Sequence, residues 1–558
     1  MNRNLNIVFD KELISDGSHQ IYWNLYFKSH DNVLSIPYEI NKNSDYYKEL
    51  YLSFIDKLNS FFTPRITLDN FPYWLVTGIS SKQSSFTSPF EIENTIKFFF
   101  LENYLLQNNF SKISIIGALD VRIYNVIKSM RFKSGVNINY NIKLLNKLRI
   151  RKYLSIVKLF LQLIFHSFLN LFGKSYNFKN YKQLIITYSS FERSINYWGG
   201  LTRLFNTKNT LSILIDINST MGKYKQKTKF TYLFLYNYFD LGFLIKKYLR
   251  ILVYYKQVIN ANEFLYKNNV NLKYLFKDII FKDFVGHNAF FNSLVISASN
   301  KLSKNLDIDI KLLYPRENQS WEKILLFYLN KRSKSIGYLH AGFKFWDLRY
   351  YLNDYSLLKS NNMIPNHFAI HSQRLIDILL KSKFFNKENF SLVESLRLKN
   401  FSVIQKTTSP KSLIVLLDYD INSSIKQIKL VKSFMDKYSF SKVKFKPHPA
   451  NSRTIRQLFK DIILVDTIII DIVKNYSHFF CSNNTTLSLE LINCGFNTAI
   501  MSSEENLDMN PLKIYDVKTK IIYDEDDLNS FLKTNGNIYK NNLIHFDNEL
   551  SSWRNLLN

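Results

Sequence analysis

The chain has 558 residues, of which 46% are hydrophobic, so it is long enough for about three domains with apolar cores. This composition excludes a disordered protein, and the low counts of glycine (14) and proline (10) exclude a fibrous or linker-rich one. The formal net charge of +29 favours a polyanionic partner, and since no basic run or nucleic-acid-binding signature is present, we expect phosphorylated substrates and an anionic membrane surface rather than nucleic acid.

The N-terminal part of the chain predicts a small α/β domain over residues 1–145. Its first residues (MNRNLNIVFDKELISDG) contain no apolar signal core, so we expect the protein to stay in the cytoplasm. Residues 73–78 (YWLVTG) and 113–117 (ISIIG) have the pattern of buried strands, and residues 91–107 have helical periodicity. We find no chemistry-bearing motif in this domain.

Residues 146–178 are predicted to form a basic amphipathic helix or linker. Within 153–173 the polar residues Lys158, Gln162, His166 and Asn170 recur every four positions on an otherwise apolar helix, which basic residues precede. Such a helix fits the plane of a membrane surface. Burial between two domains is the alternative, whereas a spanning helix is made costly by the polar residues near its middle.

The next region, 179–405, is predicted to be a second α/β domain. Core strands are expected at 183–187, 211–217, 308–314 and 335–339. The third of these strands is followed by the polar segment 315–322 (PRENQSWE), and the fourth is followed by His340.

The last region, 406–558, alternates short strands and helices and predicts a parallel sheet with right-handed crossovers. Ligands of such sheets sit beyond the carboxyl ends of the strands. Two polar motifs stand there: residues 446–449 (KPHP) and residues 482–486 (SNNTT), the second of which opens a helix. The two cysteines, Cys481 and Cys494, lie in apolar surroundings and form no CxxC pair, which indicates a reducing compartment and no structural zinc.

The SNNTT segment predicts an anion site. The first turn of a helix offers unpaired N–H groups and a partial positive charge, to which Ser482, Thr485 and Thr486 add hydroxyl donors. An ordinary helix cap is the alternative, because Asn and Thr are favoured there in any case.

His448 lies between two prolines, which fix the backbone around it. A histidine held rigidly at a strand end can donate to a phosphate and changes charge near neutral pH. Alone, the His-Pro pair could equally be a loop histidine without a role.

Taken together, the two motifs resemble the C-terminal lobe of bacterial capsule-type GT-B glycosyltransferases. The segments VKFKPHPA and HFFCSNNTTLSLELINCGFNTAIM are similar to those of capsular Kdo-transferase relatives and CMP-sialic acid-dependent enzymes, although Asn484-Thr485 stands where those families have Ser-Ser. The segments 188–201, 314–326 and 337–342 resemble a family of bacterial surface-carbohydrate biosynthesis proteins.

The resemblance implies roles for individual residues. His448, as a catalytic residue, would help the nucleotide leave, and Glu490 would face the ribose or stabilise the helix start; a solvated helix residue is the alternative for Glu490. Nucleotide binding is expected from Lys446, His448, Ser482, Asn484, Thr485, Thr486 and Glu490.

An inverting transferase also needs a base from the opposing lobe, for which we select Glu317 because it follows a predicted core strand. A structural carboxylate satisfied by nearby N–H groups is its alternative, and Glu322 is less suitable because it would lie one turn into a helix. His340 and Asp420 are expected to contact substrate, although Asp420 could instead cap the next helix. No metal and no cofactor are needed, because positive protein groups would neutralise the leaving phosphate.

The sequence therefore predicts an α/β protein of GT-B architecture, with two Rossmann-like lobes facing across a cleft and an N-terminal α/β domain. The expected function is glycosyl transfer to a growing, lipid-linked glycan of the bacterial surface, at the inner face of the cytoplasmic membrane. The leading donor is a CMP-linked acidic sugar such as Kdo or a sialic-acid relative. The alternatives are a UDP-, GDP- or CDP-linked donor, including polyol-phosphate transfer, and a non-catalytic scaffold of a polysaccharide assembly complex.

Overall fold

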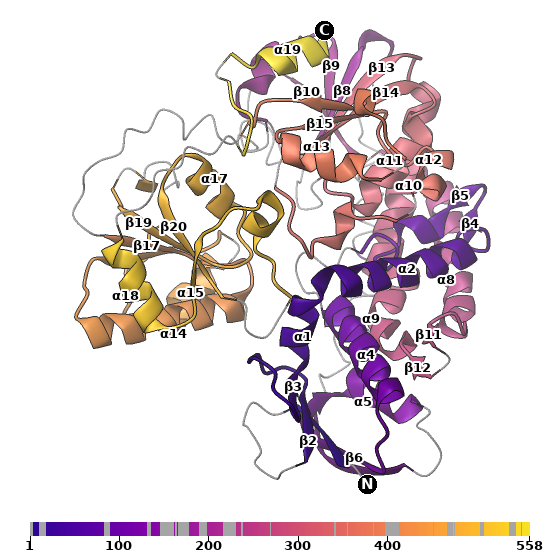
Figure 1. Ribbon diagram of the computed structural model, residues 1–558. Helices are drawn as coiled ribbons and strands as arrows, with labels where there is room; N and C mark the ends of the chain where they lie inside the picture. The colour runs from indigo at the N-terminus through magenta and orange to yellow at the C-terminus, as the bar shows by residue number, and fades with distance from the viewer. Residues whose placement is uncertain are drawn as a thin grey trace.

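The computed structural model (Figure 1) contains three parallel β-sheets with helices packed around them. The residues that it describes are 4–9, 18–82, 90–130, 136–145, 161, 165, 178–188, 198–215, 230–235, 238–267, 269–339, 342–353, 355–382, 384–396, 412–449, 451–465, 472–473, 475–502, 507–534, 543–547 and 549–558.

The first sheet has the strand order β3-β2-β1-β6-β7, and all of its strands are parallel. The strands are β1 (Asn4–Val8), β2 (His19–Tyr22), β3 (Val33–Ser35), β6 (Lys112–Asp120) and β7 (Asn137–Leu145). The helices are α1 (Ile36–Lys42), α2 (Ser44–Phe62), α4 (Phe90–Gln107) and α5 (Val121–Ser129). The strand predicted at 113–117 and the helix predicted at 91–107 are therefore confirmed.

The strand predicted at 73–78 is wrong. Tyr73–Val76 forms a short 3-10 helix, η1, in which every residue is buried. A short, wholly apolar run looks alike in a buried strand and a buried helical turn, so periodicity could not separate them.

The second sheet has seven parallel strands in the order β10-β9-β8-β13-β14-β15-β16. They are β8 (Gln183–Thr187), β9 (Thr210–Leu214), β10 (Thr231–Phe234), β13 (Ile310–Pro315), β14 (Ser333–Leu339), β15 (His367–Ile370) and β16 (Phe390–Leu392). The first strand in sequence, β8, lies inside the sheet, and the chain moves outward from it on both sides. This is the doubly wound arrangement of Rossmann folds, with its switch point between β8 and β13.

The third sheet has the order β18-β17-β19-β20-β21, again all parallel. Its strands are β17 (Leu413–Leu416), β18 (Val443–Lys446), β19 (His478–Cys481), β20 (Asn497–Met501) and β21 (Lys520–Ile522). Leu464 forms a single parallel bridge with Phe445 on the outer side of β18. On that side the chain therefore runs outward from the first strand of the sheet in sequence order, as it does in the second sheet. The helices between the strands include α14 (Ile421–Tyr438), α15 (Ser452–Leu458), α17 (Leu487–Asn493) and α18 (Glu525–Lys533).

The predicted fold class is confirmed, because two Rossmann-like lobes follow an N-terminal α/β domain, which is the GT-B architecture. Figure 1 shows the third sheet beside the other two, with the middle lobe above the N-terminal domain.

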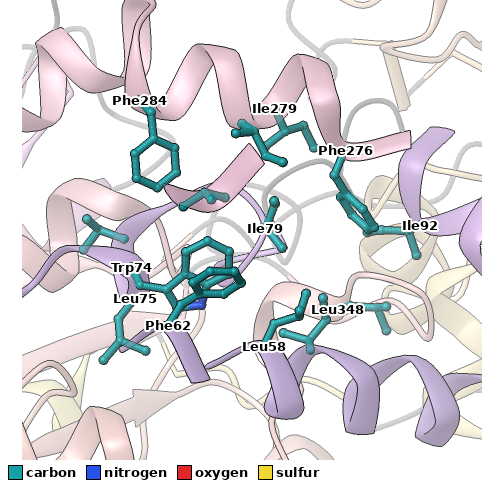
Figure 2. Packing of buried hydrophobic residues seen from close by; sticks show 14 of the residues in the cluster. Leu58, Phe62, Trp74, Leu75, Ile79, Ile92, Phe276, Ile279, Phe284 and Leu348 are labelled. Carbon is teal, nitrogen blue, oxygen red and sulfur yellow. The ribbon is translucent and has the colours of Figure 1, made fainter. Parts of the chain in front are cut away.

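The N-terminal domain does not have a hydrophobic core of its own. Three helices that the chain inserts between β10 and β13, namely α8 (Leu241–Ile259), α9 (Lys273–Phe284) and α10 (His287–Asn305), share one apolar cluster with it. Figure 2 shows Phe276 and Ile279 of α9 among residues of the N-terminal domain such as Phe62, Trp74 and Ile92. The sheet ends near the predicted boundary at 145, but the apolar packing extends well past it.

The predicted last domain, 406–558, differs from the structure at its C-terminal end. Helix α19 (Ser551–Leu557) packs on β16 of the middle sheet. Trp553 is fully buried there beside Tyr338, and its indole N–H donates to the carbonyl of Glu394 at 2.9 Å. Position along the chain assigned this short helix to the last lobe, but its apolar side packs against the middle lobe.

Most of the predicted amphipathic segment 146–178 lies outside the described residues. Leu161 and Phe165 are described, and both are helical and exposed (61% and 47%), which disagrees with burial between domains at these two positions. Among the residues that the structure describes, no helix is both long and apolar enough to cross a membrane.

Candidate functional site

The switch point of the middle sheet carries Glu317. The carboxyl ends of β8 and β13 adjoin there, so Tyr188, just after β8, meets the loop that follows β13. The Tyr188 hydroxyl donates to Glu317 Oε2 at 2.9 Å, and the side-chain amide of Gln319 donates to the same oxygen. Glu317 is thus bound by side chains at the place where doubly wound sheets bind ligands.

A second carboxylate, Glu322, holds this loop in shape. It lies in the first turn of α11 (Ser320–Leu329) and accepts the backbone N–H groups of Glu317, Asn318 and Gln319 at 2.8–3.1 Å. Glu322 therefore has a structural role and lies one turn into a helix, as expected, while the assignment of Glu317 as base or as structural carboxylate stays a prediction. Burial raises the pKa of Glu322 to about 7.

Burial also raises the pKa of Glu317, while the nearby guanidinium of Arg349 opposes the shift. Arg349 forms a two-point ion pair with Asp347, with both N–O distances at 2.7 Å, and both side chains are buried. A carboxylate with a raised pKa beside a fixed cation is a stronger base than an ordinary glutamate, which suits it to accept a proton.

The third sheet has its own switch point, between β17 and β19. The loop after β17 carries Asp418, which is buried, and the turn after β19 begins with Ser482. His448 follows the neighbouring strand β18 and interacts electrostatically with Asp418 and Lys446. Its ring packs edge-on against that of Tyr419, with 5.2 Å between the ring centroids. Burial lowers the pKa of His448.

The two lobes meet through Lys344. This residue follows β14 of the middle lobe, is buried, and donates through its ammonium group to the side-chain oxygen of Asn484 in the turn after β19. A Cβ at Gly342 would lie 3.0 Å from Leu489 of α17, so the backbone of one lobe touches the helix of the other. A peripheral ion pair between Arg374 and Asp516 joins the lobes further out.

Lys344 also links the charges of the two lobes. The carboxylates of Asp347 on its own lobe and Asp418 on the other both act on it. Burial nevertheless lowers the pKa of Lys344 to about 8. One connected group of charges therefore runs from Glu317 and Arg349 to His448.

The turn 482–486 differs in part from its predicted form. Helix α17 has only seven residues, its N-cap Thr486 makes no side-chain capping hydrogen bond, and the Thr485 hydroxyl accepts the backbone N–H of Leu487 at 3.3 Å. The helix dipole is therefore a weaker basis for anion binding than we expected. The Ser482 hydroxyl, in contrast, is buried and has no hydrogen-bond partner among the described residues, which makes it a candidate donor for a ligand.

Other predicted residues take varied positions. Glu490 is buried, so the solvated alternative is wrong. Asp420 caps α14 by accepting the N–H of Ser423 at 2.8 Å, as the capping alternative states. Lys446 ends β18 beside His448, Thr486 precedes α17, and His340 lies outside the described residues. The roles given to all of these residues stay predictions.

Sequence reasoning missed Tyr188, Lys344, Asp347 and Arg349. Each follows a strand of the middle lobe, but no motif gave any of them a role, and only strand order brings Tyr188 to Glu317 and Lys344 to Asn484. The charged segment after β14 (GFKFWDLRY, 342–350) could have indicated Lys344, Asp347 and Arg349, because loops at strand ends often carry functional residues.

A cavity of about 350 Å³ opens next to this region, between α2, residues 350–353 and 355, and α13 (Gln373–Leu380). It is lined by Tyr350, Tyr351 and Lys48 among others, and by none of the predicted site residues. Among the described part of the chain, no group of three or more His, Cys, Asp or Glu side chains is arranged to hold a metal ion.

The sequence matches no protein-family model and no curated protein. Solved structures do resemble the chain at low similarity. An α,α-trehalose 6-phosphate synthase from Burkholderia multivorans is 10% identical, with 68% of this chain and 97% of that chain covered and a TM-score of 0.38. A wall teichoic acid polymerase studied with CDPG is 8% identical, with 74% and 98% covered and a TM-score of 0.38. Scores this low decide neither the fold nor the reaction of this chain.

Proposed function

We propose that the protein is a metal-independent glycosyltransferase of bacterial surface-polysaccharide assembly that binds a nucleotide-sugar donor on its last lobe and a glycan acceptor on its middle lobe. The observation that carries this proposal is the hydrogen bond between Lys344 and Asn484, which joins the segment after β14 of the middle lobe to the turn after β19, at the switch point of the last lobe. Through this bond and the charged groups around Lys344, the carboxylate of Glu317, whose pKa is raised, is linked electrostatically to the imidazole of the proline-flanked His448.

The proposed chemistry follows from these charges. Glu317 accepts the proton of the acceptor hydroxyl as the new glycosidic bond forms. The nucleotide leaves from the sugar carbon with the bonding electron pair, and its phosphate receives hydrogen bonds from Ser482 and His448 and the positive charge of Lys344. The protein would act at the cytoplasmic face of the membrane, where activated sugars and lipid-linked acceptors meet.

We further propose a CMP-linked acidic sugar as the donor, because the 446–449 and 482–494 segments resemble CMP-dependent enzymes. Isothermal titration of the full chain with CMP, CDP and UDP tests this choice. We expect CMP to bind about tenfold or more tightly than UDP, which corresponds to about 1.4 kcal/mol. A clear preference for UDP or CDP would overturn the donor while leaving the transferase proposal standing.

Replacement of Lys344 by Met should remove a pH-dependent part of nucleotide binding. Since the pKa of Lys344 is lowered to about 8, the residue is a cation below that pH and loses its proton as the pH rises through it. We expect nucleotide affinity of the unaltered protein to fall across this pH range. The Lys344→Met variant should bind the nucleotide about tenfold more weakly at pH 7, because a charge-assisted hydrogen bond is lost. Its nucleotide affinity should not fall as the pH rises.

The matched control for this experiment is Lys432→Met, which removes a half-exposed lysine of α14 that pairs with Asp461 at the surface. Its pH profile should equal that of the unaltered protein. If the fall in affinity persists in Lys344→Met, another group carries it, and Lys344 has no part in nucleotide binding.

A further inference from the structure

Helix α8 presents an apolar stripe to solvent. The exposed fraction of its residues is 40% at Leu241, 42% at Ile245, 56% at Leu249 and 73% at Val253. Because these positions are four residues apart, they lie along one face of the helix. The opposite face carries Leu244, Ile251 and Val258, which are buried against α9 and α10. The helix is thus apolar on both sides, and the residues that the structure describes cover only one of them.

Such a continuous exposed stripe indicates a partner, because single exposed apolar residues are common whereas contiguous ones mark interaction sites. Figure 1 shows α8 at the edge of the molecule, away from the last lobe, so the lobe that carries His448 does not cover it.

The charges on the helix indicate what kind of partner covers it. The sequence of α8 (LGFLIKKYLRILVYYKQVI) contains four basic residues and no acidic one. Lys246 and Lys256 are exposed, as is Arg250, which pairs with Asp69. Lysine side chains at the border of an apolar stripe can keep their ammonium groups among lipid headgroups while their stems lie along the acyl region. An acidic lipid surface complements this helix better than a second copy of a chain with a net charge of +29.

We infer that α8 lies in the plane of an anionic membrane surface, with Leu241, Ile245, Leu249 and Val253 inserted between the lipids. This inference does not depend on the reaction that the protein catalyses, since it rests on the surface of α8 alone.

Vesicle binding by the full chain tests the inference. The protein is expected to sediment with vesicles of phosphatidylcholine and phosphatidylglycerol, and far less with phosphatidylcholine alone. The double variant Leu249→Glu/Val253→Glu should lower the partition coefficient for the mixed vesicles about tenfold or more, because carboxylates replace inserted apolar groups. Both positions are exposed, so an unchanged melting temperature should accompany this loss.

The matched control is Leu458→Glu/Ile463→Glu. These residues are exposed to a similar extent (54% and 58%), lie on the last lobe, and give the same change in net charge. The control should bind mixed vesicles as the unaltered protein does. Equal losses in both double variants would overturn the inference in favour of a general charge effect, and unchanged binding in both would overturn it directly.

A third variant tests the basic residues of α8, and a second measurement tests whether another copy of the chain covers the helix. Lys246→Gln/Lys256→Gln leaves the apolar stripe intact, so it should weaken binding to mixed vesicles but not the residual binding to phosphatidylcholine. Sedimentation velocity without lipid identifies a protein partner instead. If the unaltered chain is a dimer that Leu249→Glu/Val253→Glu dissociates, a second copy covers α8 and the membrane inference is wrong.

Discussion

Replacing Glu317 by Gln is expected to lower glycosyl transfer by about 10²- to 10⁴-fold, because the acceptor hydroxyl would lose its base. Nucleotide affinity should stay within about twofold, since Glu317 lies on the middle lobe and the proposed nucleotide site lies on the last lobe. The fold should persist as well, because a glutamine oxygen can still accept the hydrogen bonds of Tyr188 and Gln319. Single-turnover transfer and isothermal titration measure the two effects separately.

The pH profile gives a readout that a structural role would not change. Burial raises the pKa of Glu317, so the base is charged only above that raised value, and kcat/KM should rise with pH through it. Glu317→Gln should lack this acid limb.

Glu322→Gln is the matched control in the same loop. Both carboxylate oxygens of Glu322 accept backbone N–H groups, whereas the side-chain amide of glutamine has only one accepting oxygen. We therefore expect the free energy of unfolding to fall by about 1–3 kcal/mol. If Glu317→Gln shows that loss of stability with transfer intact, Glu317 is structural and is not the base.

Replacing His448 by Ala is expected to lower donor turnover by about 10²- to 10³-fold with little change in stability. The leaving phosphate would lose a positioned donor, and effects of that size follow the removal of one such group. The imidazole is half-buried against Tyr419, so its loss should disturb little of the core. Turnover of the donor, measured as released nucleotide, is the direct test.

His367→Ala is the control for this variant. His367 is also half-buried, and burial lowers its pKa as it does that of His448. It opens β15, however, and therefore lies at the amino edge of the middle sheet, away from both switch points. Equal activity of the two variants, at or near that of the unaltered protein, would remove His448 from the proposed mechanism.

Local sequence patterns predicted most of the last lobe. The strands and helices expected around KPHP and SNNTT are present, because each short apolar run is bounded by polar turn residues. The same reasoning failed at 73–78, because the first four residues, Tyr73–Val76, are all apolar, and in so short a run a helix and a strand have the same pattern. Motif reasoning also placed His448, Asn484 and Glu317 at carboxyl ends of strands, which depends only on local order along the chain.

The sequence by itself therefore determined the α/β class, the parallel sheets and the strand-end positions of the candidate residues. Only the tertiary structure decided that Lys344 joins Asn484, that Tyr188 meets Glu317, and that α19 returns to the middle lobe. The physical reason is that periodicity and turn chemistry act over a few residues, whereas these contacts join segments more than a hundred residues apart. Which segments become neighbours depends on strand order and on where apolar surfaces find cover, and neither can be obtained from a local pattern.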